Sequence, residues 1–318
     1  MTDANRRPGI DAIVPTYNNL DELRKCLAAL RQQHVPGLRV LVCVDGSTDG
    51  TLEYLRRTDL GPAVVVLDHP DHLNHGRSAA RNLALPHLAS EFVLFLDSDM
   101  QLAPGAVARH LELLAQRDCV SVGDVVYLNQ AENLWARYIG SRGKNKYAAD
   151  ARLQPTDFVT ANCALRTADL LAVGGFDPTL NGYGGEDTEL AFRLTEERQL
   201  PLIFNPEARA ETTEAKSTEE GLAQLREFAR VSLGPIRNRH AAARSWFLVD
   251  RADSTRLSDR LFRSFLNPVV DRLVDLLRVV APFRVQRLLL NYMVIRAVFA
   301  GYREGRAQDV RAGGGTIR

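Results

Sequence analysis

Short apolar runs alternate with segments of helical spacing through the first third of the chain. Four five-residue runs, 10–14, 40–44, 63–67 and 92–96, are predominantly apolar and show no strict alternation. Runs of this kind are typical of strands that are buried on both faces of a sheet. The β-α-β repetition predicts an α/β fold with a mostly parallel central sheet, flanking helices and right-handed crossovers.

Local signals delimit the predicted helices. Residues 20–30 place leucines on one face, and Asn19 with Glu22 resembles a capping box in which Asn takes the Ser/Thr role. Residues 78–85 form the predicted helix before the fourth strand. Pro104 suits the first position of the next helix, because proline has no N–H to leave unpaired there.

The fourth apolar run, residues 92–96, ends in Asp97, Ser98 and Asp99. Ligands of open α/β sheets lie beyond the carboxyl ends of the strands. Two carboxylates at such an edge form an oxygen-rich site that suits Mg²⁺ or Mn²⁺ carrying phosphates. A polar turn with helix-capping aspartates explains the same three residues equally well. The residues at the other strand ends are needed to choose between these two interpretations.

Polar residues gather at those other strand ends as well. The residues are Pro15, Thr16, Tyr17 and Asn18 after the first strand, Asp45 and Ser47 after the second, and Gly76, Arg77 and Arg81 before the fourth. On one sheet edge they outline a nucleotide crevice, in which Tyr17 covers a base, Asp45 accepts the imide N–H of a uracil, and Arg77 or Arg81 meets phosphate. The chain lacks the glycine motifs of dinucleotide enzymes and P-loop NTPases.

In the second half, glycines precede a pair of carboxylates. Residues 181–185 contain three glycines, and Glu186 and Asp187 follow at the start of a predicted helix. Asp187 shares a face with Leu190 and Ala191, three and four residues later. Such a carboxylate is either a helix cap or a base in a cleft, and the glycines allow a ligand to approach the backbone closely. Both interpretations stay open on this segment alone.

Four of these segments resemble the signature blocks of the family-two inverting glycosyltransferases. They are residues 13–18, 44–50, 76–82 and 96–99, and the resemblance covers roughly residues 9–210 in order. It implies the GT-A fold and a nucleotide-sugar donor, with a UDP-sugar favoured. It also implies Mn²⁺ or Mg²⁺, and a saccharide, lipid-linked or other hydroxyl acceptor.

The resemblance also implies roles for individual residues. Asp187 is the expected general base that takes the proton of the acceptor hydroxyl, and Glu186 is its neighbour in acceptor binding. Asp99 is expected to hold the metal, and Asp97 to contact ribose or complete the metal shell. Donor binding includes Ser98 and the strand-end residues named above. The expected acceptor-binding residues are Tyr183, Gly184 and Gly185.

One metal ligand of many relatives has no counterpart in this chain. They carry a histidine after the strand that follows the Glu-Asp helix, but residues 206–216 contain none. Glu211 and Glu214 are alternative ligands, because carboxylates suit Mn²⁺ and Mg²⁺. Taken singly, each of these two glutamates is explained somewhat better as a solvated charge in a loop than as a metal ligand.

Composition limits the classes of function. The chain has 318 residues, 45% of them hydrophobic, and a net charge of +1, which implies no general attraction to nucleic acid. Its four scattered cysteines predict free buried thiols in a reducing cytosol. The polar start and the absence of 18 uninterrupted apolar residues lead us to expect a cytoplasmic protein without signal peptide or transmembrane helix.

We expect a GT-A catalytic domain over residues 1–215 and a helical extension over residues 216–318. The donor half of the catalytic domain covers about 9–115 and the acceptor half about 116–215.

The extension combines apolar helical stripes with arginines between residues 261 and 302. Packing on the catalytic domain or in a homo-oligomer explains the stripes. Peripheral contact with the inner membrane face is the alternative, supported by Arg284, Arg287, Arg296 and Arg303.

Two other classes of protein share some of these sequence features. A nucleotidyltransferase also binds metal with paired carboxylates, but it usually has a Gly-rich basic loop where this chain has residues 15–18. A non-catalytic glycan- or partner-binding relative is expected to have lost Asp99 or Asp187, and both are present.

Overall fold

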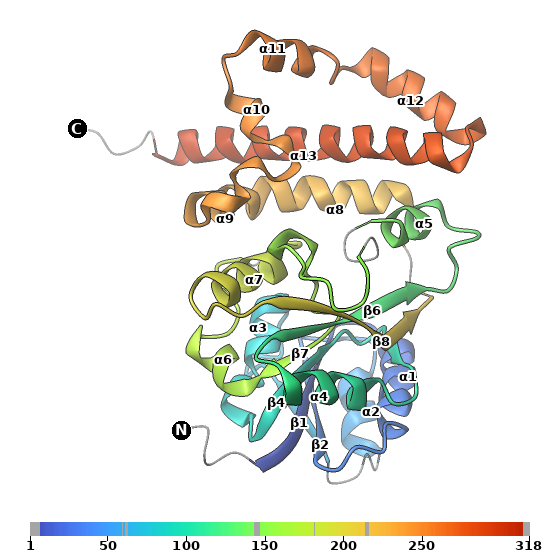
Figure 1. Ribbon diagram of the computed structural model, residues 1–318, viewed down its shortest axis with the longest axis vertical. Helices are drawn as coiled ribbons and strands as arrows, with labels where there is room; N and C mark the ends of the chain where they lie inside the picture. The colour runs from blue at the N-terminus through green and yellow to red at the C-terminus, as the bar shows by residue number, and fades with distance from the viewer. Residues whose placement is uncertain are drawn as a thin grey trace. The chain divides into compact units, whose positions relative to one another are not determined.

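The computed structural model describes residues 7–58, 60, 63–142, 147–180, 182–213 and 216–313. The chain divides into two compact units. The first comprises Met1–Asn181 with Glu186–Ala215, and the second comprises Gly182–Gly185 with Lys216–Arg318. Figure 1 shows that the first unit is built around a sheet and that the second consists of helices.

A mixed sheet of eight strands forms the centre of the first unit, within the described ranges. The strands are β1 (Arg7–Thr16), β2 (Leu38–Val44), β3 (Val64–Asp68), β4 (Ser90–Leu96), β5 (Gln101–Leu102), β6 (Val120–Tyr127), β7 (Asn162–Arg166) and β8 (Leu202–Thr212). Their order across the sheet is β3-β2-β1-β4-β7-β6-β8-β5. Strands β1 to β4 pair in parallel, as do β6 and β8, whereas β5 and β7 are antiparallel to their neighbours. The predicted fold class is confirmed.

Both faces of the sheet are covered, which explains why its strands are apolar without alternation. On β4, Phe92, Leu94 and Leu96 belong to one hydrophobic cluster, and Val93 and Phe95 belong to the other. The first cluster includes side chains of α1 (Leu20–Arg31), α2 (Thr51–Arg57) and α4 (Ala106–Gln116), and the second those of α6 (Thr167–Ala172) and α7 (Glu186–Glu196). Shorter helical segments are α3 (Arg77–Asn82), η2 (Leu85–His87), α5 (Leu134–Gly140) and η4 (Pro155–Asp157).

The predicted capping box of α1 is wrong. The side chain of Asn19 makes no capping hydrogen bond and instead donates to Ser98 Oγ at 3.2 Å. Asp49 Oδ2 accepts the hydrogen bond of the Leu20 N–H at 2.9 Å in its place. The cap therefore comes from the loop after β2, which a local sequence pattern does not reveal.

Two other helix boundaries also differ from the prediction. Helix α4 begins at Ala106 after Gly105, so Pro104 lies outside the helix. The helix predicted over residues 78–85 spans Arg77–Asn82, and a 3₁₀ turn at η2 follows it.

The second unit contains α8 (Thr218–Val231), α9 (Leu233–Arg239), η5 (Ala241–Leu248), α10 (Asp250–Asp253), α11 (Leu257–Ser264), α12 (Pro268–Val280) and α13 (Phe283–Gly313). Helices α8 and α13 approach each other closely at glycines. A Cβ on Gly301 would lie 2.0 Å from the carbonyl oxygen of Arg226, and one on Gly305 would lie 2.2 Å from that of Arg230. Any larger residue at these two positions would separate the helices.

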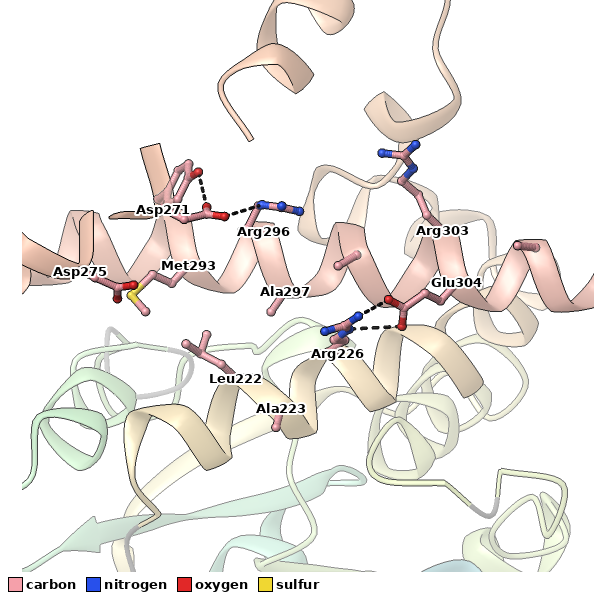
Figure 2. Close-up of a pocket in the computed structure, with 13 residues that line it drawn as sticks. Leu222, Ala223, Arg226, Asp271, Asp275, Met293, Arg296, Ala297, Arg303 and Glu304 are labelled. Atoms are coloured by element: carbon pink, nitrogen blue, oxygen red, sulfur yellow. Dashed lines mark hydrogen bonds and ion pairs between the residues drawn. The ribbon is translucent and has the colours of Figure 1, made fainter. Parts of the chain in front are cut away.

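An open groove of about 800 Å³ lies among α8, α12 and α13 (Figure 2). Ala297 and Met293 are among its apolar lining residues. Asp271 accepts hydrogen bonds from Tyr292 Oη at 2.7 Å and from Arg296 Nε at 3.3 Å. None of the helices in the described residues combines the length and the apolar composition needed to cross a bilayer. All four cysteines are free and buried, as predicted.

Candidate active site

The loops after β1 and β2 bind each other at the carboxyl edge of the sheet. Thr16 and Val44 pair at the ends of these strands. Beyond them, Asn18 Oδ1 accepts the N–H of Thr48 at 2.7 Å, and the Asn18 N–H donates to Ser47 Oγ at 3.1 Å. These contacts hold the segment that carries Tyr17, whose exposed fraction is 51%. A large aromatic ring is thus presented to solvent at this edge.

Asp45 organises the next loop. Its buried carboxylate accepts the N–H of His75 at 2.8 Å and that of Gly76 at 3.0 Å. His69 Nε2 lies 3.1 Å from Asp45 Oδ1. Because both carboxylate oxygens bind main-chain N–H groups, the structure gives Asp45 a part in shaping the turn before α3. Arg77, the first residue of that helix, is exposed.

Arg81 lies at the centre of a cluster of charges. Its side chain is 3% exposed; Nη2 donates to Asp97 Oδ1 at 2.9 Å and Nη1 donates to Glu186 Oε1 at 3.2 Å. Nη1 also lies 3.7 Å from Asp187 Oδ1. Burial disfavours the charged guanidinium, but the carboxylates outweigh it and raise the pKa of Arg81 above its ordinary value. Arg81, one of the two arginines expected to meet phosphate, binds Asp97 and Glu186 in this structure.

Asp187 is the accessible member of the carboxylate pair at the start of α7. Its side chain is 24% exposed, whereas that of Glu186 is 3% exposed. Thr160 Oγ1 donates to Asp187 Oδ1 at 2.6 Å, and the Thr160 N–H donates to Oδ2 at 3.2 Å. Burial, and then the charge of Glu186, raise the pKa of Asp187 to about 6. Asp187 lies inside α7, which begins at Glu186, so it is not the residue that precedes and caps the helix.

A tight turn presents the carboxylates that follow β4. The N–H of Asp97 donates to the carbonyl oxygen of Ala161 at 3.2 Å, and the N–H of Met100 donates to that of Asp97 at 3.0 Å. Asp97 and Asp99 are partly exposed, and Ser98 between them is buried. The turn leads into β5, where Gln101 pairs with Glu211 of β8. The i, i+2 carboxylates are thereby presented side by side on one turn.

The oxygen atoms of this turn fit a hard divalent cation in part. Two carboxylates supply donors of the right kind, and Arg81 already binds Oδ1 of Asp97. Within the described ranges no three His, Cys, Asp or Glu side chains form a group that could hold a metal. Glu211 forms an ion pair with Arg209 at 2.7 Å, and Glu214 lies outside the described residues. A cation here needs further ligands from its substrate or from water.

A model of the family described as glycosyl transferase family 2 matches residues 11–174, about half of the chain. The chain belongs to glycosyltransferase family 2. A second model, described as the N-terminal domain of galactosyltransferase, matches residues 143–212. The two matches together cover the segments that carry Arg81, Asp97 and Asp187.

Curated relatives share parts of this family 2 sequence. The pre-mycofactocin glycosyltransferase of Mycobacterium tuberculosis is 32% identical over 196 residues, which are 59% of this chain and 39% of the relative. The hyaluronan synthase of Pasteurella multocida is 35% identical over 104 residues, 32% of this chain and 10% of the relative. The chain therefore spans less than half the length of these relatives.

Solved structures show the same GT-A fold at low sequence identity. The mannosyltransferase PcManGT from Pyrobaculum calidifontis, in complex with GDP-Man and Mn²⁺, gives a TM-score of 0.63 at 19% identity over 94% of this chain and 88% of that one. Residues 1–349 of TarS from S. aureus, in complex with UDP, give 0.54 at 20% identity over 98% and 93%.

The glycine segment before α7 of this family 2 chain packs within the helical unit. Gly185 has φ +98°, and a Cβ there would lie 2.9 Å from side-chain atoms of Phe228, Ser232 and Ile236. Tyr183 Oη accepts a hydrogen bond from Lys216 Nζ at 2.7 Å. The expected acceptor residues are thus held by α8 and α9, and they continue directly into Glu186.

Thr160 is a site residue that sequence reasoning did not identify. It lies just before β7, and antiparallel pairing of β7 with β4 brings this segment to the Asp97 turn. A single threonine ahead of a strand carries no signal of its own. Only the pairing of distant strands places it beside Asp187.

Proposed function

We propose that this chain transfers a sugar from a nucleotide-diphosphate sugar to an acceptor hydroxyl, with inversion at the anomeric carbon. A UDP-sugar is the favoured donor, and the acceptor is a saccharide, a lipid-linked molecule or another hydroxyl compound. Family membership and nucleotide-bound structural neighbours support the reaction class. Asp187 and the turn carrying Asp97 and Asp99 supply its chemical groups.

The observation that carries this proposal is the position of Arg81 between two sets of carboxylates. One guanidinium nitrogen faces Asp97, and the other faces Glu186 and Asp187. An inverting transfer needs a base on the acceptor side and charge compensation on the diphosphate side of one anomeric carbon. Arg81 fixes the distance between the two because both are bound to the same rigid, planar group.

In the proposed reaction, Asp187 takes the proton from the acceptor hydroxyl. The acceptor oxygen forms a bond to the anomeric carbon as the bond from that carbon to the diphosphate breaks, and the nucleoside diphosphate leaves. A pKa of about 6 leaves Asp187 largely ionised at neutral pH yet more basic than an ordinary aspartate. Thr160 orients the carboxylate by donating to both of its oxygens.

Mn²⁺ or Mg²⁺ would be held by Asp99 and Asp97, with the remaining positions filled by diphosphate oxygens and water. A divalent cation there stabilises the negative charge that develops on the leaving diphosphate. On the protein side, Arg81 holds Asp97 by donating from Nη2 to its Oδ1 at 2.9 Å. We propose donor binding by the exposed Tyr17 and Arg77 at the same edge.

A donor screen tests the reaction class. The protein is incubated with UDP-, GDP- and dTDP-sugars, with and without Mn²⁺, and both the melting temperature and the release of nucleoside diphosphate are measured. We expect one nucleotide class to raise the melting temperature, since a ligand that binds only the folded state stabilises it. Release of the sugar 1-phosphate in place of nucleoside diphosphate would contradict the proposal, because it means attack at the α-phosphorus and indicates nucleotidyl transfer.

Replacing the base tests the mechanism. Asp187→Asn keeps the size of the side chain but removes its ability to accept the proton. Transfer is expected to fall by about 10²–10⁴-fold, the usual contribution of a positioned general base, while donor affinity stays near that of the wild type. A near-normal rate would remove Asp187 from the mechanism and make Glu186 the next candidate. Glu196→Gln, at the other end of α7, is the matched control.

A further inference from the structure

Helices α11 and α12 carry an apolar stripe that the helical unit does not cover. Figure 1 shows the two helices following one another beside α13. Within each of the two helices the side chains recur at intervals of three or four residues, which places them on one face of that helix. The stripe consists of Leu257 (70% exposed), Leu261 (55%), Phe265 (65%), Val269 (78%), Leu273 (54%), Leu276 (70%) and Val280 (80%).

The opposite faces of these helices account for their packing. Val274 of α12 is buried, and Phe262 of α11 contacts Phe299 of α13 with ring centroids 5.8 Å apart. The exposed stripe is therefore not the core-facing side of a loosely placed helix. Each helix has a buried apolar contact on one side and an exposed apolar face on the other.

Acidic side chains turn away from the stripe. Asp271 binds Tyr292 and Arg296 of α13 (Figure 2). Asp275 binds Arg278 at 3.1 Å, and Asp259 is buried. These are the only acidic residues between positions 256 and 288. The carboxylates of the segment are thus paired or buried.

Arginines, in contrast, are the prevailing charge of the segment that carries the stripe. Residues 256–288 contain seven arginines against three aspartates and include neither lysine nor glutamate. Five of the arginines are exposed: Arg256, Arg260, Arg272, Arg284 and Arg287. An apolar face with a rim of cations is complementary to a surface that is apolar inside and anionic outside.

We propose that the α11–α12 stripe lies in the headgroup region of an anionic lipid bilayer and attaches the protein to it peripherally. An amphipathic helix of this composition buries its apolar face at the boundary of headgroups and acyl chains, and its arginines bind lipid phosphates. A second copy of the chain is the competing occupant. In a twofold dimer the same patch would face itself, bringing arginines against arginines. The exposed carboxylates next to it, Asp275 and Glu219 of α8, are both already paired with Arg278. The charges therefore favour lipid.

Vesicle co-sedimentation of the full chain tests this inference independently of the transfer reaction. The vesicles are phosphatidylcholine alone, or phosphatidylcholine mixed with phosphatidylglycerol. We expect binding to the mixed vesicles that weakens with salt, and little binding to the neutral ones. Leu276→Glu is expected to reduce the partition coefficient at least tenfold. Leu128→Glu, at an exposed leucine of the first unit (54%, against 70% for Leu276), should leave the partition coefficient unchanged.

The arginines give a second, separate measurement. Arg272→Gln should lower binding to the anionic vesicles by roughly fivefold, the effect of one basic residue near such a surface, without changing binding to neutral ones. Equal binding of wild type and Leu276→Glu would overturn the proposal. So would a dimer in solution that Leu276→Glu converts to a monomer without any vesicle binding, because the occupant would then be a second copy.

Discussion

Two regions of this molecule break the ordinary distribution of side chains, and they do so in opposite ways. Around Arg81, the first unit buries a guanidinium and the carboxylate of Glu186 at 3% exposure each. Along α11 and α12, the second unit exposes seven apolar side chains by 54–80%. Buried charge and contiguous exposed apolar surface both cost free energy, and both are uncommon without a function. The comparison separates the proposed site of sugar transfer from the proposed lipid-binding surface.

The two regions also differ in what maintains them. The charges around Arg81 hold each other through hydrogen bonds from 2.9 to 3.2 Å and are therefore mutually dependent. The residues of the stripe are exposed by 54–80% and therefore depend little on one another in the isolated chain. A substitution in the first region should therefore disturb the other charged residues of the cluster. A substitution in the second region should leave the neighbouring residues of the stripe undisturbed.

The largest effect is expected for Arg81→Met, which keeps much of the side-chain volume and removes the charge. Asp97, Glu186 and Asp187 would then lose their shared cation. Breaking a buried ion pair on one side costs about 3–5 kcal/mol, so the free energy of unfolding should fall by that order, and activity should be lost. Denaturant unfolding measures the first effect.

Arg77→Met is the control for that measurement. Arg77 begins the same helix but is exposed, so its loss should change stability by no more than about 0.5 kcal/mol. Equal stability of Arg81→Met and Arg77→Met would show that the charge cluster is not an interdependent unit.

Thr160→Val probes the same cluster with a smaller change. The Thr160 hydroxyl stabilises the ionised form of Asp187 and lowers its pKa, against the raising effect of burial. A general base works when deprotonated, so the transfer rate should rise with pH through about 6 in the wild type. Without the hydroxyl this limb should move to higher pH, because the neutral form is then favoured.

The pH–rate profile of kcat/KM checks this, with Thr160→Ser as the matched control. Serine keeps the donor and should restore the wild-type limb. A profile that is flat between pH 5 and 8, the range where a base with a pKa near 6 titrates, would contradict the role of Asp187.

Only part of this site could be predicted from the amino-acid sequence alone. The strand before Asp97 and the inward face of α7 were predictable, because burial on both sides and helical spacing are properties of a few adjacent residues. Arg77 or Arg81 was expected to bind phosphate, since a basic residue near a strand end has that meaning locally. The carboxylates that Arg81 binds lie 16 and 105 residues away along the chain, and only the folded structure brings them to its guanidinium.

Strand β6 was missed for a related reason. Gly123 interrupts its apolar run, which lowers the strand signal. A Cβ at Gly123 would lie 2.3 Å from the carbonyl oxygen of Ala208 and from Asn162 Nδ2. The glycine is needed because the side chain of Asn162, on the neighbouring strand, crosses the sheet there. Such a requirement belongs to the folded sheet and leaves no trace in the local pattern.

Gly185→Ala tests the glycine segment that leads into Glu186 and Asp187, the proposed acceptor-side carboxylates. Alanine would be strained at φ +98° and would press on Phe228, Ser232 and Ile236. We expect a loss of more than about 1 kcal/mol in the free energy of unfolding and a raised KM for acceptor, with donor affinity unchanged. Gly174→Ala is the control, because Gly174 also has a positive φ but open space around it. Equal effects would mean that backbone strain alone matters.

The smallest effect is expected for Leu276→Glu in the absence of lipid. Leu276 is 70% exposed, so in water the substitution removes little packing, and the surrounding arginines tolerate a carboxylate. The melting temperature and the transfer rate toward a water-soluble acceptor should match those of the wild type, within the roughly 0.5 kcal/mol typical of surface changes. The neighbouring Val274→Glu, on the buried side of the same helix, should instead unfold α12. If Leu276→Glu destabilises the protein as strongly as Val274→Glu, the stripe is part of the folded core in solution. The stripe would then not differ from the charge cluster around Arg81 in the way proposed, because both would contribute to the stability of the isolated chain.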